Sequence, residues 1–117
     1  MKRNWEVIRK ILVRVEEEPS EDSNLSSSDF EGIAPEVAAY HVRLLIEAGL
    51  LVGSCRNSTG SPWCQIQRMT WAGHEFLDAI RRDTAWNRVR ELARDRGIDL
   101  SFEVIKALAS KAVASLL

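Results

Sequence analysis

Apolar and polar residues repeat with two different periods along this chain, and the change of period is clearest between Tyr40 and Val52. The run YHVRLLIEAG has helical spacing, and Gly49 suits the left-handed backbone position that ends many helices. Leu50, Leu51 and Val52 then have the composition of a half-buried strand. A helix that leads directly into an apolar strand predicts the recognition helix of a winged helix followed by its wing.

Helical spacing of apolar residues predicts four further helices. The first has its apolar stripe at three-and-four spacing and is capped by Asn4. Pro35 suits the first turn of the helix that carries Tyr40. The predicted ranges, each from its first or capping residue, are Asn4 to Glu17, Pro35 to Ala48, Thr70 to Asp83, Thr84 to Arg96, and Ser101 to the end of the chain.

The remaining segments predict a small sheet and polar loops. Residues 63–70 return as a second wing strand after the loop GSCRNSTGSP at 53–62. Residues 29–33 are a candidate short strand at the base of the wing, and residues 20–28 read as a solvated loop that buries little. The predicted fold class is therefore α+β: a winged-helix-like domain, mostly helical, with a two- or three-stranded wing sheet and additional C-terminal helices.

One part of the chain departs from a standard helix-turn-helix. Two helices normally precede the wing strand, yet only a polar loop and a short apolar stretch lie between Pro19 and Pro35. We therefore expect the second helix to be short, irregular or missing.

Length and composition indicate one domain over residues 1–117, with a winged-helix-like part at 1–70 and C-terminal helices at 71–117, because 45% hydrophobic residues suffice for one core. Sixteen Lys and Arg against seventeen Asp and Glu give a net charge of −1. Any contact with DNA must therefore come from a local basic patch. No apolar run approaches the roughly 20 residues of a membrane span, so we expect a cytoplasmic protein without a membrane partner.

Chemistry-bearing residues are sparse. Cys55 and Cys64 could form a cross-strand disulfide, but a reducing cytosol favours free thiols. Neither His41 nor His74 has metal-ligand spacing to the cysteines, and the residue four after His74 is an aspartate rather than a second histidine. No nucleophile elbow and no phosphate-binding glycine loop is present. The sequence therefore predicts no metal, no cofactor and no enzymatic activity.

Three motifs together resemble a known family. They are the opening MKRNWEVIRKIL, then YHVRLLIEAGLL, then TWAGHEFLDAIRRDTAWN, and they extend from Met1 to about Asn87. This combination resembles the prophage-associated domain of unknown function 2513 family, whose members look like winged helices. The resemblance implies the fold and a phage or bacterial setting, and it implies no reaction or ligand.

Two functional hypotheses from different classes follow. The first is a small DNA-binding protein, a phage or prophage transcriptional regulator. The second is a winged-helix module for protein contact, either homodimerisation or binding of a host or phage protein. The residues assigned to DNA contact are Ala39, Tyr40 and Arg43 on the helix, Arg56, Asn57, Ser58 and Thr59 at the wing tip, and Lys2 and Arg3 at the N-terminus. Those assigned to a protein interface are Tyr40, Leu44, Trp86, Phe102, Leu108, Val113 and Leu116.

Overall fold

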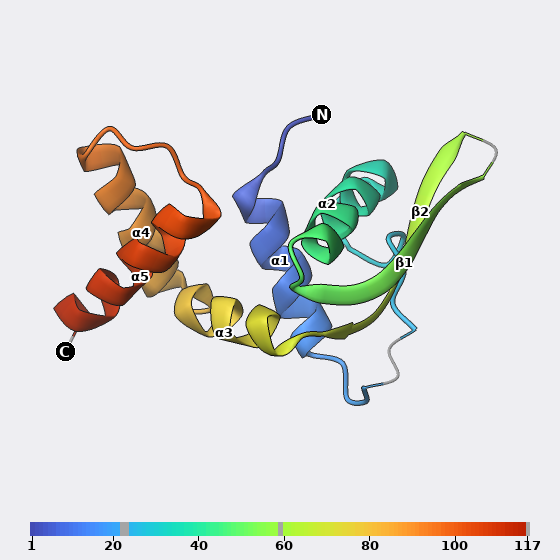
Figure 1. Ribbon diagram of the computed structural model, residues 1–117, viewed down its shortest axis with the longest axis horizontal. Helices are drawn as coiled ribbons and strands as arrows, with labels where there is room; N and C mark the ends of the chain where they lie inside the picture. The colour runs from blue at the N-terminus through green and yellow to red at the C-terminus, as the bar shows by residue number, and fades with distance from the viewer. Residues whose placement is uncertain (22–23, 59, 117) are drawn as a thin grey trace. The chain divides into compact units, whose positions relative to one another are not determined.

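The chain forms an α+β fold in a computed structural model that describes residues 1–21, 24–58 and 60–116 (Figure 1). For residue 58 and residues 112–116 only the backbone is described. It divides into two compact units, Met1–His74 and Glu75–Leu117, with the boundary inside a helix. The elements are α1 (Trp5–Glu16), α2 (Pro35–Glu47), β1 (Leu51–Ser58), β2 (Ser61–Met69), α3 (Trp71–Ile80), α4 (Asp83–Asp95) and α5 (Phe102–Leu116).

The first unit is built on α2, which packs against α1 and against both strands. Asn4 caps α1 as predicted, because its side-chain oxygen accepts hydrogen bonds from the Glu6 and Val7 backbone amides. Gly49 ends α2 with φ 78°, as the Ala-Gly turn predicts. The core of this unit combines one stripe from each helix with the inner face of the hairpin, and includes Ile11, Leu12, Val42, Leu45, Leu50 and Ile66.

The segment between α1 and α2 contains no helix among its described residues, so the second helix of a standard helix-turn-helix is missing. The predicted strand at residues 29–33 is wrong, since these residues are irregular, with a turn at Glu31 and Gly32. The sheet is instead approached by Leu25–Ser27: the Ile66 amide donates to the Leu25 carbonyl at 2.8 Å, and the Ser27 amide donates to the Cys64 carbonyl at 2.8 Å. Leu25 is only 5% exposed. The expectation that residues 20–28 bury little is therefore also wrong.

The wing is longer than the sequence predicted. Residues 53–58 continue β1 and residues 61–62 begin β2, so most of the predicted ten-residue loop is antiparallel hairpin. Ser54, Arg56 and Asn57 are exposed, so this part of β1 carries the polar composition of a loop. Composition alone therefore misplaced the strand ends.

A β-bulge interrupts the hairpin at its base. Val52 pairs with Arg68 and Gly53 pairs with Ile66, which leaves Gln67 as the extra residue. A side-chain Cβ at Gly53 would lie 2.3 Å from the Gln65 carbonyl oxygen, so only glycine is accommodated there. The extra residue reverses the alternation, which explains why Met69 is buried and Arg68 exposed.

The two cysteines form a disulfide, and the prediction of free thiols is wrong. Cys55 and Cys64 are directly paired across the hairpin, with 4.0 Å between their Cα atoms. The Cys64 sulfur is fully buried and lies 3.4 Å from the Ala39 carbonyl oxygen of α2. Spacing alone could not reveal this pairing, because it depends on the register of a hairpin whose strands the sequence placed too short.

Two residues, Thr70 and Gly73, fix the junction between the wing and α3. Thr70 caps α3 as predicted, since its hydroxyl accepts from the Gly73 amide at 2.9 Å and donates to the Gly49 carbonyl at 2.6 Å. A Cβ on Gly73 would lie 2.2 Å from the Leu50 carbonyl oxygen. The first turn of α3 therefore sits directly against the start of β1, which accounts for the glycine in the TWAGH motif.

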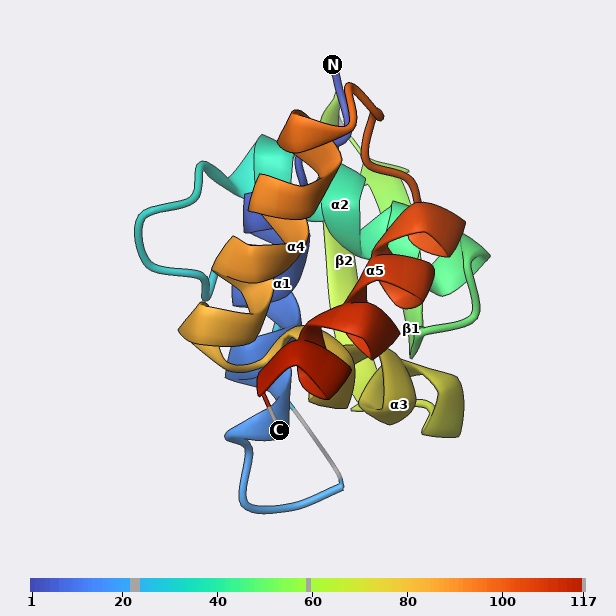
Figure 2. The ribbon, with the colours of Figure 1, turned by 90° about the vertical axis from the view of Figure 1, so that its left-hand side faces the viewer.

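The second unit pairs α4 with α5, which run side by side in two perpendicular views (Figures 1 and 2). Ser101 caps α5 as predicted, with its hydroxyl accepting from the Val104 amide at 3.2 Å. The predicted cap at Thr84 is wrong: α4 begins at Asp83, after Arg82. An acid at the first helical position favours this earlier start through the helix dipole.

Candidate functional site

The solvent-facing stripe of α2 is short and mixed in charge. Glu36, Arg43 and Glu47 are exposed at helical spacing, with the partly exposed Tyr40 between them. Ala39, assigned to this face from the sequence, is only 1% exposed and lies against the hairpin. The stripe therefore offers one cation and two anions, a charge of −1.

The N-terminal arm, residues 1–4, is held against α2 by a buried histidine. His41 is 1% exposed, and its Nε2 accepts the Asn4 backbone N–H at 2.8 Å. Its Nδ1 lies 2.8 Å from the Val37 carbonyl oxygen. Nε2 needs a lone pair for the first bond, so the ring proton is on Nδ1 and donates to Val37. Both ring nitrogens of this buried histidine therefore have hydrogen-bond partners.

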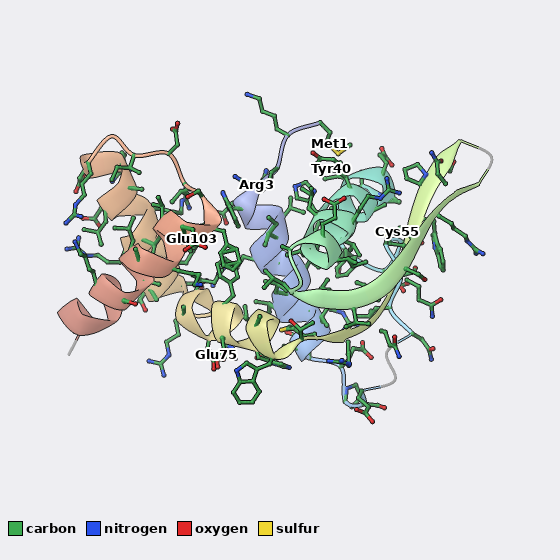
Figure 3. The ribbon with its side chains drawn as sticks, in the orientation of Figure 1. Met1, Arg3, Tyr40, Cys55, Glu75 and Glu103 are labelled. Atoms are coloured by element: carbon green, nitrogen blue, oxygen red, sulfur yellow. A yellow bond between two sulfur atoms is a disulfide. The ribbon has the colours of Figure 1, made fainter. Side chains whose placement is uncertain are left out.

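This bond brings the basic arm beside α2. The arm carrying Met1 and Arg3 runs next to the half of α2 that holds Tyr40 (Figure 3). Arg3 is exposed and its guanidinium lies 4.6 Å from the centre of the Trp5 ring. With Lys2 and Arg3 included, the charge of the surface changes from −1 to +1. The arm therefore decides whether this surface attracts or repels an anion.

The wing residues assigned to DNA do not share one face of the hairpin. Arg56 lies over the Trp63 ring at 4.5 Å, and these two residues are paired across the strands. Arg56 and Trp63 are the chain neighbours of Cys55 and Cys64, whose side chains face α2. Because successive side chains of a strand point to opposite faces, Arg56 points away from α2 and Asn57 points to the same side as α2. The backbone of Ser58 extends β1, whereas the Ser58 side chain and Thr59 lie outside the described residues.

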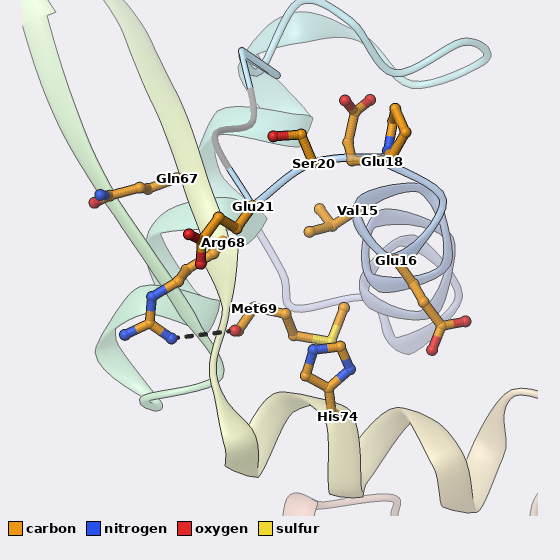
Figure 4. Close-up of a pocket in the computed structure, with 10 residues that line it drawn as sticks. Val15, Glu16, Glu18, Ser20, Glu21, Gln67, Arg68, Met69 and His74 are labelled. Atoms are coloured by element: carbon orange, nitrogen blue, oxygen red, sulfur yellow. Dashed lines mark hydrogen bonds between the residues drawn. The ribbon is translucent and has the colours of Figure 1, made fainter.

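An open cavity of about 370 Å³ lies in the first unit, between the end of α1, β2 and the first turn of α3 (Figure 4). Val15 and Met69 contribute apolar walls, and Glu16, Glu21 and His74 line its edge. Across the described part of the chain, no three His, Cys, Asp or Glu side chains converge to hold a metal ion. The lining of the cavity therefore combines carboxylates with Arg68 and His74.

Comparison with known proteins decides the family. The hypothetical-protein family DUF2513 matches residues 2–99 of this chain. The chain belongs to the DUF2513 family. An uncharacterised protein of Haemophilus influenzae is 36% identical over 117 residues, covering 100% of this chain and 99% of that protein. No solved structure matches the chain significantly.

Family membership confirms the resemblance found in the three motifs. The DUF2513 match includes the arm, α2, the wing and α4, and it ends before α5 begins at Phe102. Within the described residues, no helix has the length and apolar character needed to cross a bilayer.

The residues assigned to a protein interface are placed unevenly in this DUF2513 chain. Tyr40 and Leu44 are partly exposed on α2. Trp86 and Leu108 are 2% and 4% exposed in the single chain, and the Phe102 ring stacks on Phe76 with 4.7 Å between centroids. The side chains of Val113 and Leu116 lie outside the described residues. Much of the apolar stripe offered for dimerisation is therefore covered by the chain itself.

Two further features were not predicted from the sequence. The link between Asn4 and His41 joins residues 37 positions apart, and no local pattern signals it. The second is compositional: six arginines occur within residues 81–96, a density that was visible without any structure.

Proposed function

We propose that this DUF2513 protein is a non-enzymatic winged-helix protein that binds duplex DNA through the arm and α2, as a transcriptional regulator of phage or prophage origin. The observation that carries this proposal is the part-buried hydrogen bond from Asn4 to His41, because it holds a basic arm beside the exposed stripe of the helix that precedes the wing. Arms of this kind supply phosphate or groove contacts next to a recognition helix.

The proposed roles differ by residue. Arg43 is the one cation on the exposed stripe of α2 and would supply base contact, which for arginine on guanine contributes roughly 1–3 kcal/mol of discrimination. Tyr40 would pack against the sugar-phosphate backbone of the DNA or against the edge of a base. Lys2 and Arg3 would neutralise phosphates, and Arg56 would contact phosphate from the outer side of the wing.

The test is a fluorescence titration of labelled duplexes of several sequences at two salt concentrations. Arg43→Ala should reduce affinity and the differences among duplexes together. A Lys2→Ala/Arg3→Ala double variant should weaken all duplexes alike and lower the salt slope by about 2, given roughly 0.9 per phosphate contact. Arg56→Ala removes one charge on the other side of the hairpin and should lower affinity uniformly and by less. Absence of wild-type binding at low salt would refute the proposal.

Action on DNA would place the protein in the cytoplasm, where thiols are kept reduced. The titration is therefore run with and without a dithiol reductant. Binding that survives reduction separates the role of the arm and α2 from that of the disulfide-linked wing.

A second function, protein contact, is favoured by Glu36 and Glu47. These acids flank Arg43 on the exposed stripe and would oppose phosphate, whereas Tyr40 and Leu44 offer apolar surface beside them. In this case α2 would pair with a second copy of the chain. Sedimentation velocity at high micromolar concentration should then show a dimer that Leu44→Glu converts to monomer, and a monomeric wild type would exclude the homodimer.

A further inference from the structure

The disulfide of the wing joins two cysteines in different surroundings. Cys64 is 0% exposed, whereas Cys55 is partly exposed on β1. Figure 3 labels Cys55 on the hairpin, and among the described residues no strand pairs with the outer side of β1. A thiol in solution attacks a disulfide at the sulfur that it can reach. The accessible sulfur is therefore that of Cys55.

The position of Cys64 does not depend on the disulfide alone. Its backbone amide donates to the Ser27 hydroxyl oxygen at 3.0 Å, and its carbonyl oxygen accepts from the Ser27 amide at 2.8 Å. Its sulfur lies 3.4 Å from the Ala39 carbonyl oxygen of α2, so a reduced Cys64 would have an acceptor for its S–H in place. We therefore expect β2 to keep its position when the disulfide opens.

The outer part of β1 depends more strongly on the disulfide. In an antiparallel sheet, a residue whose amide and carbonyl both point to one neighbouring strand makes no ladder bonds with the other. Cys64 directs both groups to Ser27, so at this pair the sulfur bridge joins β2 to β1. Beyond it lies the outer hairpin, residues 56–58 and 60–63, whose pairs are Arg56–Trp63, Asn57–Pro62 and Ser58–Ser61. A two-stranded ribbon of this length is marginally stable in water by itself, so its order depends on the bridge at its base.

We propose that the Cys55–Cys64 disulfide is a site of thiol–disulfide exchange with a dithiol reductant, and that its redox state controls the order of the outer hairpin. A thiolate of the reductant attacks the Cys55 sulfur and forms a mixed disulfide, while the bond to Cys64 breaks and the Cys64 sulfur leaves with the electron pair and takes up a proton. The second thiolate of the reductant then attacks its own sulfur in the mixed disulfide and releases Cys55, which also takes up a proton. The protein gains two electrons and two protons, and the dithiol becomes a disulfide.

The consequence for DNA rests on the proposed function. Arg56 follows Cys55 directly on β1 and belongs to the outer hairpin. Its phosphate contact would need an ordered hairpin, so the oxidised protein would use Arg56 and the reduced protein would bind through the arm and α2 alone. Reduction would then act on one of the proposed contacts and spare the others.

The first experiment tests the attacked sulfur with two folded single-cysteine variants, Cys64→Ala and Cys55→Ser. Each is incubated with oxidised glutathione, and mass spectrometry follows the mixed disulfide. Cys55 in the first variant should react about tenfold or more faster than Cys64 in the second, because burial blocks the reagent. The same reaction in urea is the control and should remove the difference. Equal rates in the folded variants would overturn the assignment of Cys55.

The second experiment tests the order of the outer hairpin in the wild-type full chain, with and without dithiothreitol and without urea. Hydrogen exchange of the Arg56 and Trp63 amides should accelerate about tenfold or more on reduction. The Ile66 amide, which donates to the Leu25 carbonyl, is the internal reference and should change little. A Cys55→Ser/Cys64→Ala variant should not respond to dithiothreitol. A disulfide that opens only after urea is added, or unchanged exchange after full reduction, would overturn the proposal.

A DNA titration in both redox states separates this proposal from the proposed function. Reduction of the wild type should weaken binding by as much as Arg56→Ala does, and Arg56→Ala itself should no longer respond to reductant. An Arg56→Ala variant that still responds would overturn the link between the disulfide and Arg56. Absence of DNA binding in both states would refute the proposed function, while the glutathione and hydrogen-exchange results would still decide the exchange site and the order of the outer hairpin.

Discussion

The two units of this chain are held together by different kinds of contact. In Met1–His74 the defining contacts join residues far apart in sequence: the arm with α2 through His41, Leu25 with β2, and β1 with β2 through a disulfide. In Glu75–Leu117 the main contacts are those between two amphipathic helices, α4 and α5, joined by a short connection that ends in the helix cap Ser101. The first unit thus has a specific geometry with an acidic balance, while the second has a simple geometry with a concentrated positive charge. The contacts between distant residues and the densest cationic segment, residues 81–96, therefore belong to different parts of the chain.

The largest difference in stability that we expect between the units comes from a steric clash. Gly73→Ala would place a Cβ 2.2 Å from the Leu50 carbonyl oxygen, and a backbone atom cannot move aside cheaply. We expect the first unit to lose about 3 kcal/mol or more of stability. Hydrogen exchange followed by mass spectrometry, with urea denaturation, measures the loss in each unit.

The matched control is Gly97→Ala in the second unit, where φ is 62° and nothing lies within 4 Å of the added Cβ. Only the left-handed backbone then opposes alanine, which costs about 1–2 kcal/mol. If Gly73→Ala proves as mild as this control, the close approach of α3 to β1 is not a structural requirement.

The next effect concerns the disulfide. Reduction removes a cross-link between residues nine apart, and the loop-entropy relation gives about 2–3 kcal/mol for a ring of this size. Thermal unfolding with and without reductant should show a lower midpoint for the first unit and no change in the second. A Cys55→Ser/Cys64→Ala variant serves as control and should not respond to reductant. An unchanged wild-type midpoint would show that the strands need no covalent link.

The smallest effect concerns the arm. His41→Phe keeps an aromatic ring but removes the acceptor for the Asn4 amide, and an orphaned part-buried donor costs about 1–3 kcal/mol. Exchange of the Asn4 amide hydrogen should also accelerate. Phe in place of the exposed His74 is the control and should be nearly neutral. A slow Asn4 amide in the His41 variant would mean that something other than His41 holds the arm.

The difference between local and long-range contacts also decides which features could be predicted from the sequence. The end of α2 at Gly49 and the caps at Asn4, Thr70 and Ser101 depend on residues within a few positions of one another, so the pattern located them. The disulfide, the bulge at Gln67 and the packing of Leu25 on β2 depend on the register between segments. No local pattern contains that information.

The candidate site shows the same limit. Arg43 and Tyr40 were assigned to the exposed stripe of α2 from helical spacing, and the structure leaves both at least partly exposed there. Ala39 was placed on that stripe as well, but the hairpin covers it, because a helix flanked on two sides keeps a narrower free face than periodicity suggests. Arg56 was grouped with Arg43 by its place in the wing, and only the strand pairing reveals that it faces the other way.

The hairpin has two edges, and they are protected differently against unwanted strand addition. β2 is approached on its outer side by Leu25–Ser27, whereas among the described residues no strand pairs with the outer side of β1. An open edge is a template on which another chain can add a strand and begin an aggregate. The solvated run of Ser54, Arg56 and Asn57, with the bulge at the base, makes β1 a poor template because it is polar, charged and twisted. The same polar composition that made the sequence of β1 resemble a loop therefore protects this edge strand against strand addition by another copy of the chain.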